Sequence, residues 1–166
     1  ERALLMRLYF LRHGKAESRA DWQGRDADRP LTEEGEEIMR REVEALRAMD
    51  FAPDVIVTSP LARARRTAEI VADGLGLSGR LVEDERLAPG FDVARLEQVL
   101  ATRAPGARAV LVVGHEPDFS ETVAALIGGG DVVMKKGGLA RVDVAAPAAG
   151  GGRLDWLLTP PLLGGR

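Results

Sequence analysis

The chain contains two histidines, and each stands just after an apolar run. His13 follows LYFL and an arginine in the stretch LYFLRHGK, and His115 follows AVLVV and a glycine in the stretch AVLVVGHEP. Short apolar runs of this kind are typical of buried parallel strands, and open α/β sheets bind ligands at the carboxyl ends of such strands. We therefore expect both histidines at one edge of a sheet, close enough to act on the same ligand.

Arginines near the histidines indicate which ligand this edge would bind. Arg12 is the neighbour of His13, and Arg63 falls in the first turn of a helix that the stretch TSP (58–60) is predicted to open. The N–H groups and dipole at a helix N-terminus favour anions, and the planar guanidinium matches phosphate oxygens. A histidine in these surroundings can serve as a nucleophile toward phosphorus. The pattern predicts a phosphoryl-transfer site.

The sequence does not support other catalytic arrangements. A catalytic metal usually needs three protein ligands, and neither histidine has a close cluster of acids or histidines. The nucleophile elbow G-x-S-x-G and the glycine–lysine phosphate loop are both absent. We expect no metal and no other cofactor. Of Arg63, Arg65 and Arg66, at least one is expected to face solvent, because helical spacing separates Arg65 from Arg66 by about 100°.

Predicted strands and helices alternate along the chain. The strands are expected at 6–11, 54–59, 81–85 and 109–113, and the helices at 32–49, 59–76, 92–104 and 118–129. Thr32 and Ser59 are the expected N-caps of the first two helices, with Pro60 at the first helical position of the second. Segments 139–145 and 153–158 are expected to pair as a hairpin or as edge strands. This order predicts an α/β fold, a three-layer α/β/α sandwich with a mostly parallel central sheet and the hairpin at or near its edge.

Composition narrows the class of protein. The chain has 166 residues, 45% of them apolar, a formal net charge of −3 and no cysteine. This length suits one domain, which we place at 6–160, with residues 1–5 as upstream or appended sequence. The lack of cysteine excludes disulfides and fits a reducing cytoplasm, where we expect the protein. No apolar run reaches the ~20 residues of a membrane span, no secretory signal pattern is present, and the charge gives no reason to expect nucleic acid or membrane as a partner.

Four motifs, in order and spread over most of the chain, resemble those of the histidine phosphatase superfamily. They are LRHGKAE at 11–17, RPLTEEG at 29–35, TSPLARARRTAE at 58–69 and VVGHEP at 112–117. With its short length, the chain looks most like the small bacterial SixA-type phosphohistidine phosphatases of that superfamily. The resemblance implies a phosphoglycerate mutase-like fold and a phosphatase that needs no metal.

The resemblance also implies a role for each residue of the site. His13 would attack phosphorus and carry the phosphoryl group, while Arg12, Arg63 and His115 would surround the phosphate oxygens. This arrangement suits the loose transition state of phosphoryl transfer, which leaves charge on the equatorial oxygens. Nearby arginine charge would also keep His13 neutral, as a nucleophile must be.

Further residues are expected to contribute to substrate binding. Gly14 would let the chain turn away without covering His13, and Ser59 would lie at the end of its strand beside the phosphate. The stretch SRADWQGRDADRP (18–30) is expected to form the rim that meets the substrate, with Trp22 either exposed there or packed on the sheet edge.

The general acid is expected among the acidic residues at 81–92. Glu85, in VEDERLAPG, is the leading candidate, ahead of Glu83, Asp84 and Asp92, and the alternative for this cluster is a solvated turn. An alkoxide leaving group is very basic, near the ~15.7 pKa of water, so its departure needs an acid. An imidazole, whose protonated form has a pKa of ~6.5, departs more readily. A phosphohistidine phosphatase can therefore work with a weak acid or none.

The sequence therefore predicts a phosphatase that removes phosphate from phosphohistidine on a protein, such as a histidine phosphotransfer domain, and releases inorganic phosphate. The chain has no long insertion that would cap its pocket for a small metabolite, and its polar helix faces fit a monomer. The alternative is a small-molecule phosphomonoesterase of the same superfamily, acting on a sugar phosphate or nucleotide. A phosphate-binding module without turnover is less favoured because the four site residues are intact. A mutase is less favoured because an open pocket would lose its phosphoryl group to water.

Overall fold

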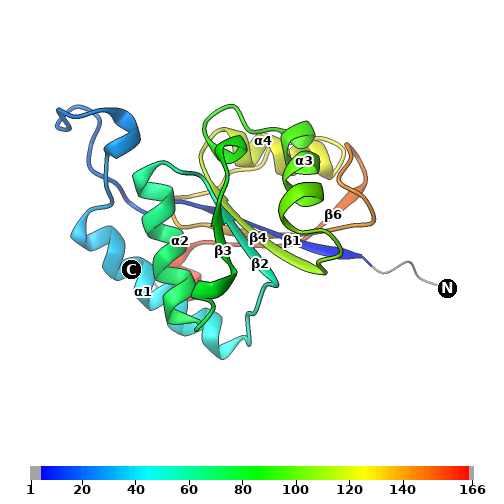
Figure 1. Ribbon diagram of the computed structural model, residues 1–166, viewed down its shortest axis with the longest axis horizontal. Helices are drawn as coiled ribbons and strands as arrows, with labels where there is room; N and C mark the ends of the chain where they lie inside the picture. Colours follow the sequence, from blue (N-terminus) through cyan, green and yellow to red (C-terminus); the bar gives the residue numbers. More distant parts are fainter. Residues whose placement is uncertain (1–4, 165–166) are drawn as a thin grey trace.

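Residues 5–164, the part of the chain that this computed structural model describes, are built around a six-stranded mixed sheet (Figure 1). The strands are β1 Met6–Arg12, β2 Val55–Thr58, β3 Leu81–Glu83, β4 Ala109–Gly114, β5 Leu139–Val144 and β6 Gly152–Leu158. Their order in the sheet is β3-β2-β4-β1-β5-β6. The four strands from β3 to β1 run parallel, and β5 and β6 pair antiparallel at the edge, as predicted. Of the predicted upstream stretch 1–5, residues 1–4 lie outside the described residues.

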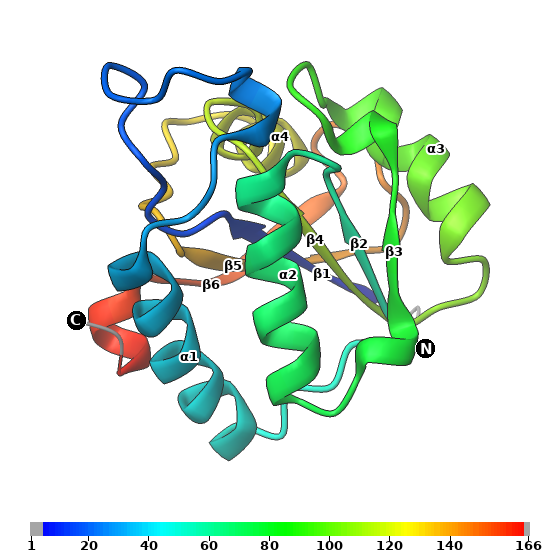
Figure 2. The same ribbon diagram turned by 60° about the vertical axis from the view of Figure 1, so that its left-hand side comes forward.

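Helices cover both faces of the sheet, which confirms the predicted three-layer sandwich. Helices α1 (Glu33–Ala48) and α2 (Ala62–Gly74) lie on one face, and α3 (Val93–Arg103) and α4 (Asp118–Leu126) lie on the other (Figures 1 and 2). Short 3-10 turns complete the chain: η1 (Asp26–Asp28), η2 (Ser78–Arg80), η3 (Glu85–Leu87) and η4 (Pro160–Leu163). The helices between residues 5 and 164 are all too short or too polar to span a bilayer.

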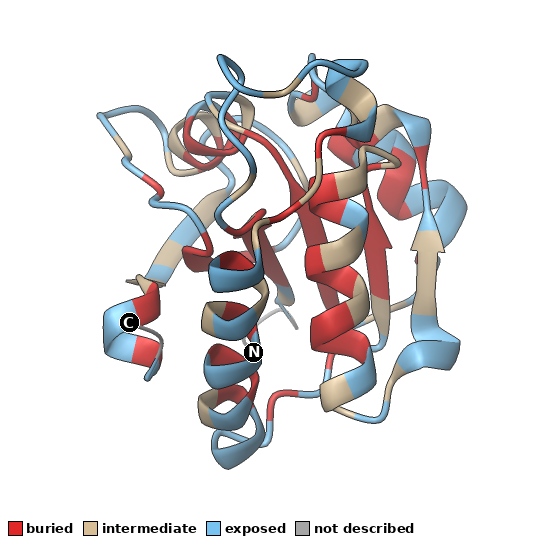
Figure 3. Cartoon of the chain, turned by 90° about the vertical axis from the view of Figure 1, so that its left-hand side faces the viewer, coloured by how far each residue is buried: buried red, intermediate tan, exposed pale blue. Residues whose placement is uncertain are grey.

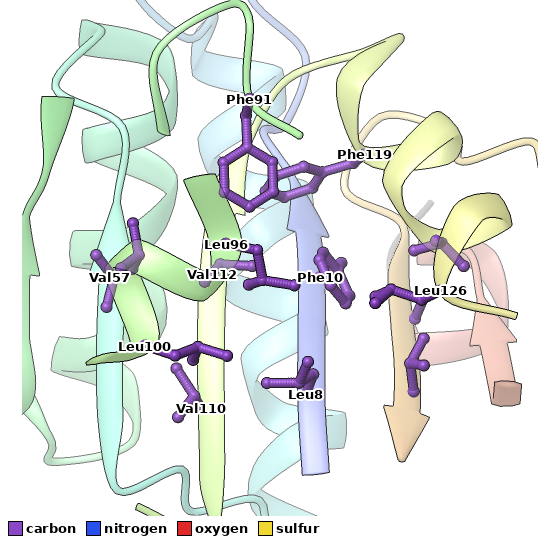
Figure 4. Packing of buried hydrophobic residues seen from close by; sticks show 14 of the residues in the cluster. Leu8, Phe10, Val57, Phe91, Leu96, Leu100, Val110, Val112, Phe119 and Leu126 are labelled. Carbon is purple, nitrogen blue, oxygen red and sulfur yellow. The ribbon is translucent and has the colours of Figure 1, made fainter. Parts of the chain in front are cut away.

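Each face of the sheet buries its own apolar core. Toward α3 and α4, the ring of Phe10 lies edge-on to Phe119 with centroids 5.4 Å apart, and Phe119 in turn contacts Phe91 (Figure 4). Toward α1 and α2, Met39 and Leu111 belong to the second core. The helices turn their buried sides to the sheet (Figure 3), and all six residues of β4 are buried because both faces of this strand are covered. The continuous apolar runs of the sequence therefore mark central strands.

The helix α2 begins later than the sequence predicts. The expectation that Ser59 caps this helix and that Pro60 opens it is wrong, because Leu61 is the N-cap and the first helical residue is Ala62. The side chain of Ser59 is engaged elsewhere, since its Oγ lies 2.8 Å from Nε2 of His115. Thr58 therefore ends β2, and Ser59 and Pro60 belong to the turn that leads into α2.

Two glycines permit close packing of the segments that follow β1 and β4. Thr32 caps α1 as predicted, and its Oγ1 accepts a hydrogen bond from the Gly35 N–H at 2.9 Å. A Cβ on Gly35 would lie 2.1 Å from the carbonyl oxygen of Lys15, so this contact with the segment after β1 requires glycine. A Cβ on Gly114, the last residue of β4, would lie 2.7 Å from Cζ of Phe119. The two strand ends are thus held against helices on opposite faces.

Candidate active site

The ends of β1 and β4 lie side by side and bring the two histidines together. Arg12 pairs with Gly114 in the parallel register of these strands, so His13 and His115 each follow a paired residue. The His13 N–H donates to the Gly114 carbonyl oxygen at 3.0 Å. The imidazole ring centroids are 5.4 Å apart, with the ring planes at 58°. The equivalent positions noted in the sequence therefore become one site at the carboxyl edge of the sheet.

His13 is neutral and has one defined tautomer. Its Nδ1 lies 2.8 Å from the carbonyl oxygen of Gly14, which can only accept, so Nδ1 carries the proton and Nε2 carries the lone pair. The pKa of His13 is lowered to about 3, first by burial and also by the neighbouring His115, Arg63 and Arg12, against the opposing effect of the Gly14 carbonyl. Nε2 is therefore available as a nucleophile at neutral pH.

Two arginines flank the histidines, each with part of its guanidinium unpaired. Arg12 donates from Nη1 to the carbonyl oxygen of Met134 at 2.9 Å. Arg63 is 3% exposed and donates from Nη1 and Nη2 to the backbone oxygen and the carboxylate of Asp26, at 2.9 and 3.1 Å. The Nε atoms of both arginines are buried and have no hydrogen-bond partner among the described residues. Burial lowers the pKa of both side chains, yet an arginine stays charged at neutral pH. The site is therefore positively charged and desolvated.

The hydroxyl of Ser59 orients His115. The Ser59 Oγ accepts a hydrogen bond from the Leu61 N–H at 3.2 Å and can donate its own proton to Nε2 of His115, 2.8 Å away. Nδ1 then carries the ring proton, and this buried atom has no partner within residues 5–164. The pKa of His115 is lowered to about 4, first by burial and then by Arg63. A neutral imidazole with one free donor therefore completes the cluster.

A pocket of about 820 Å³ opens onto both histidines and both arginines. Most of its remaining wall comes from residues 15–32, which include the predicted substrate rim 18–30. Trp22 belongs to neither apolar core; it lies at the rim beside Arg19, Asp26 and Arg29. Its half-buried ring folds back over Gly24, and its Nε1 donates to the carbonyl oxygen of Arg25 at 2.9 Å. The rim is therefore polar, with its tryptophan turned into the loop itself.

Ser59 and Gly14, both expected to bind substrate, lie behind this pocket instead of lining it. Ser59 is fully buried at the end of β2 and reaches the site through His115. Gly14 donates its N–H to Oγ1 of Thr67 at 3.1 Å, and a Cβ at this position would lie 3.1 Å from Cγ of Met39. In the structure Ser59 contacts His115, while Gly14 packs against α1 and α2 and lines a groove beside the pocket.

Glu85 lies outside the pocket, which corrects the predicted place of the general acid. It is exposed at the start of η3. The other candidates also have different roles, since Asp84 is held by two arginine side chains. Glu83 pairs with Arg65, and Asp92 caps α3. Because β3 is three residues long and the outermost strand on its side of the sheet, its end does not reach the histidines.

The neighbouring arginines of α2 face away from the site. Arg66 bonds Glu36 at 2.9 Å, Arg65 lies 3.6 Å from Glu69, and both side chains are more than a third exposed. Of the three arginines in this run, Arg63 alone lines the pocket, and the expectation that at least one would face solvent is confirmed.

Glu116, Asp26 and Arg29 line the pocket without an individual role predicted from the sequence, although Asp26 and Arg29 lie within the predicted rim 18–30. Glu116 follows His115 directly, and its carboxylate accepts hydrogen bonds from the N–H and the hydroxyl of Ser120. Asp26 and Arg29 bond each other at 3.1 Å, and both line the pocket. Glu116 carried a signal, because it lies within VVGHEP beside a site histidine. Asp26 and Arg29 belong to a loop whose long-range contacts no local pattern predicts.

Comparisons with known proteins identify relatives of this chain. The family model described as the histidine phosphatase superfamily (branch 1) matches residues 8–89. The phosphohistidine phosphatase SixA of Escherichia coli (strain K12) is 30% identical over 156 residues, which cover 93% of this chain and 94% of SixA. A solved structure of the protein histidine phosphatase SixA complexed with tungstate is similar with a TM-score of 0.82 at 28% identity, over 94% of this chain and 98% of that one. A probable phosphoglycerate mutase, GpmB of Cronobacter sakazakii (strain ATCC BAA-894), is 34% identical over 66% of this chain and 51% of its own length.

Proposed function

This chain belongs to the histidine phosphatase superfamily and is a phosphatase, and we propose that its substrate is phosphohistidine on a protein, such as a histidine phosphotransfer domain. The observation that carries the proposal is the cluster of Arg12, His13, Arg63 and His115 in an open pocket, in a chain similar to SixA over nearly its whole length. The reaction passes through a phosphorylated His13 and uses no metal.

The first step moves the phosphoryl group from the substrate to His13. The lone pair on Nε2 attacks phosphorus, an N–P bond forms to His13, and the N–P bond of the substrate breaks. With its other ring nitrogen protonated, the substrate histidine leaves as a neutral imidazole. His13 keeps its proton on Nδ1, where the Gly14 carbonyl oxygen stabilises the positive charge of the phosphorylated ring.

Arg12, Arg63 and the Nδ1–H of His115 stabilise the phosphoryl group during both transfers. The transition state spreads charge over three equatorial oxygens, and donors that are already oriented in a buried site stabilise such charge strongly. In the second step water attacks phosphorus, and the N–P bond to His13 breaks. The proton of the water goes to the departing inorganic phosphate or to solvent. His13 returns to its starting tautomer.

The acidic residues around the site favour an imidazole leaving group over an alkoxide. An alkoxide needs a proton donor as it departs, and Glu85, which the sequence favours as that donor, lies outside the pocket. Four acidic residues within residues 5–164 do line the pocket. Asp26 is bonded to Arg29 and Arg63, and Glu116 accepts two hydrogen bonds from Ser120. Glu17 and Asp21 are exposed. A neutral imidazole leaves without such a donor because its protonated form has a pKa of only ~6.5.

Competing substrates test the proposal directly. A phosphorylated histidine phosphotransfer domain and a panel of sugar phosphates and nucleotides are supplied separately, with EDTA present. We expect a higher kcat/KM for phosphate release from the protein than from any ester. Faster turnover of an ester would make the chain a small-molecule phosphomonoesterase. Phosphate release from none of the substrates would indicate a phosphate-binding module.

A further inference from the structure

A second groove adjoins the catalytic pocket, between α1, the loop that follows α4, and η4. We call it the side groove; its volume is about 570 Å³. Figure 2 shows η4 in red beside α1, against which it packs. Arg12, Lys15 and Lys136 line both the side groove and the catalytic pocket. The two hollows are therefore continuous at the arginine that flanks the nucleophile.

The floor of the side groove is apolar and closely packed. Ile38 and Met39 of α1 form one side of this floor, and Pro160 and Pro161 of η4 form the other side. Gly137 lies between these two sides, and its φ of +73° favours glycine. A Cβ on Gly137 would lie 2.9 Å from Cγ of Pro160 and 3.3 Å from Sδ of Met39. The floor therefore has a defined shape, suited to an apolar side chain from outside.

The rim of the side groove is positively charged. The chain has three lysines, Lys15, Lys135 and Lys136, and all of them line this groove together with Arg12. Within residues 5–164, no aspartate or glutamate lines this groove. Lys15 pairs with Glu34, whereas Lys135 and Lys136 are exposed and form no ion pair within residues 5–164. In a chain of net charge −3, this cluster of positive charge indicates an acidic partner.

On the basis of the function proposed above, we propose that the side groove binds the segment of the substrate protein that flanks its phosphohistidine. An apolar side chain of that segment occupies the floor between Ile38 and Pro160, and an acidic side chain meets Lys135 and Lys136. On a helix, a residue one turn from the phosphohistidine lies about 5.4 Å along the axis, which suits a groove that begins at Arg12. The catalytic pocket then selects the phosphoryl group, and the side groove selects the protein that carries it.

Charge reversal on the rim separates binding of the substrate protein from hydrolysis of the phosphoryl group. Lys135 lines the side groove but not the catalytic pocket. Lys135→Glu should raise KM for a phosphorylated histidine phosphotransfer domain about tenfold and leave turnover of free phosphohistidine unchanged. The matched control is Arg108→Glu, which makes the same change of charge at an exposed residue. Arg108 lies just before β4, at the end of that strand away from the site. This control should keep the kinetics of the wild type on both substrates.

A second variant tests the apolar floor. Pro161 is exposed in η4, so Pro161→Asp adds a charge to the floor without emptying the core. We expect the same rise in KM for the phosphoprotein and no change with free phosphohistidine, while thermal unfolding shows that the variant is folded. Unchanged phosphoprotein kinetics in both groove variants would overturn the proposal, and so would an equal loss on both substrates.

The experiments distinguish an incorrect proposal for the side groove from an incorrect proposal for the substrate. A wild-type chain that hydrolyses esters but no phosphoprotein overturns the proposed function, and the groove proposal with it. A wild-type dimer that becomes monomeric on Lys135→Glu, measured by sedimentation, assigns the groove to a second copy of this chain. Binding to phosphatidylserine vesicles that Lys135→Glu abolishes assigns it to a membrane surface. Either of these results overturns the proposal for a substrate segment.

Discussion

The active site and helix α1 both bury ionisable side chains, and the two regions differ in what those side chains can bind. At the ends of β1 and β4, burial keeps His13 and His115 neutral. The Gly14 carbonyl oxygen fixes the proton of His13 on Nδ1, and the Ser59 hydroxyl orients His115 through Nε2. On α1, Glu42 is also fully buried, but neither of its carboxylate oxygens has a hydrogen-bond partner among the described residues. Burial raises the pKa of Glu42 to about 8. Burial alone does not identify a functional group, whereas a fixed orientation beside an open pocket does.

This difference predicts that substitutions in the first region change activity and that substitutions of Glu42 change stability. The largest effect on activity is expected for His13→Ala, because this change removes the atom that bonds phosphorus. Hydrolysis of phosphohistidine should fall by a factor on the order of 10⁴ or more. An alkaline quench with radiolabelled phosphoprotein should trap label on the wild-type chain and none on the variant. A labelled His13→Ala chain would mean that a different residue is the nucleophile.

The next largest effect is expected at Arg63, which brings charge into the buried site. Arg63→Ala should lower kcat on the order of 10²- to 10³-fold, as the loss of one oriented donor to a developing anion typically does. The matched control is Arg66→Ala in the same helix, whose side chain pairs with Glu36 outside the pocket. Steady-state kinetics should show less than about a twofold change in this control. Equal losses in the two variants would attribute the effect to the helix and not to the pocket.

A smaller effect, on stability alone, is expected at Glu42. Between pH 4.5, the ordinary pKa of this group, and about 8, the folded protein holds a proton on Glu42 that the unfolded chain has lost. The free energy of unfolding should therefore fall as pH rises through this range. Glu42→Gln should remove that contribution and stabilise the protein by roughly 2 kcal/mol or more at pH 9, with little change at pH 5.

Urea unfolding at pH 5, 7 and 9 measures this effect, with Glu44→Gln, an exposed residue of the same helix, as the control. The control should follow the pH dependence of the wild type. If Glu42→Gln follows it as well, Glu42 titrates normally and the contrast between the two regions does not hold.

The positioning residue Ser59 should have a weaker effect than the groups that touch the phosphoryl. Ser59→Ala removes one buried hydrogen bond to His115, so kcat should fall about tenfold, equivalent to ~1.4 kcal/mol. Circular dichroism should show an unchanged fold. A normal kcat in this variant would show that turnover does not depend on the Ser59 hydroxyl.

For the last prediction, the ionisation of the two site histidines, we expect no change near neutral pH. Because the pKa values of His13 and His115 are about 3 and about 4, neither ring should titrate between pH 5.5 and 8 in the free enzyme. Imidazole chemical shifts followed by NMR should stay constant over that range. A midpoint near 6.5 for either ring would mean that water reaches the site freely, and it would remove the proposed reason for its neutrality.

The fold and the centre of the site could be predicted because their signals are local in sequence. The runs that became β1 and β4 are continuously apolar, and each is followed by a histidine at the same distance, so the parallel pairing of Arg12 with Gly114 places both rings together. Thr32, followed by acidic residues and apolar residues at helical spacing, predicts the start of α1.

The remaining features depend on contacts between distant residues. Ser59 has the type of an N-cap, but His115, which is 56 residues away, engages its hydroxyl. Glu85 follows an apolar segment, yet the short strand before it ends at the margin of the sheet. Asp26 reaches Arg63 across 37 residues. Periodicity and composition contain no information on such side-chain pairs.

The contact between Asp26 and Arg63 has a consequence for product release. The backbone oxygen and the carboxylate of Asp26 already accept hydrogen bonds from both Nη atoms of this guanidinium. A phosphate oxygen that binds there therefore competes with Asp26. Because Asp26 is tethered, its effective concentration is high and independent of the solution. Free inorganic phosphate has only the contacts of the catalytic pocket to offset the displacement of Asp26, whereas a phosphoprotein has further contacts outside that pocket. We therefore expect Asp26 to weaken the binding of inorganic phosphate more than the binding of a phosphoprotein.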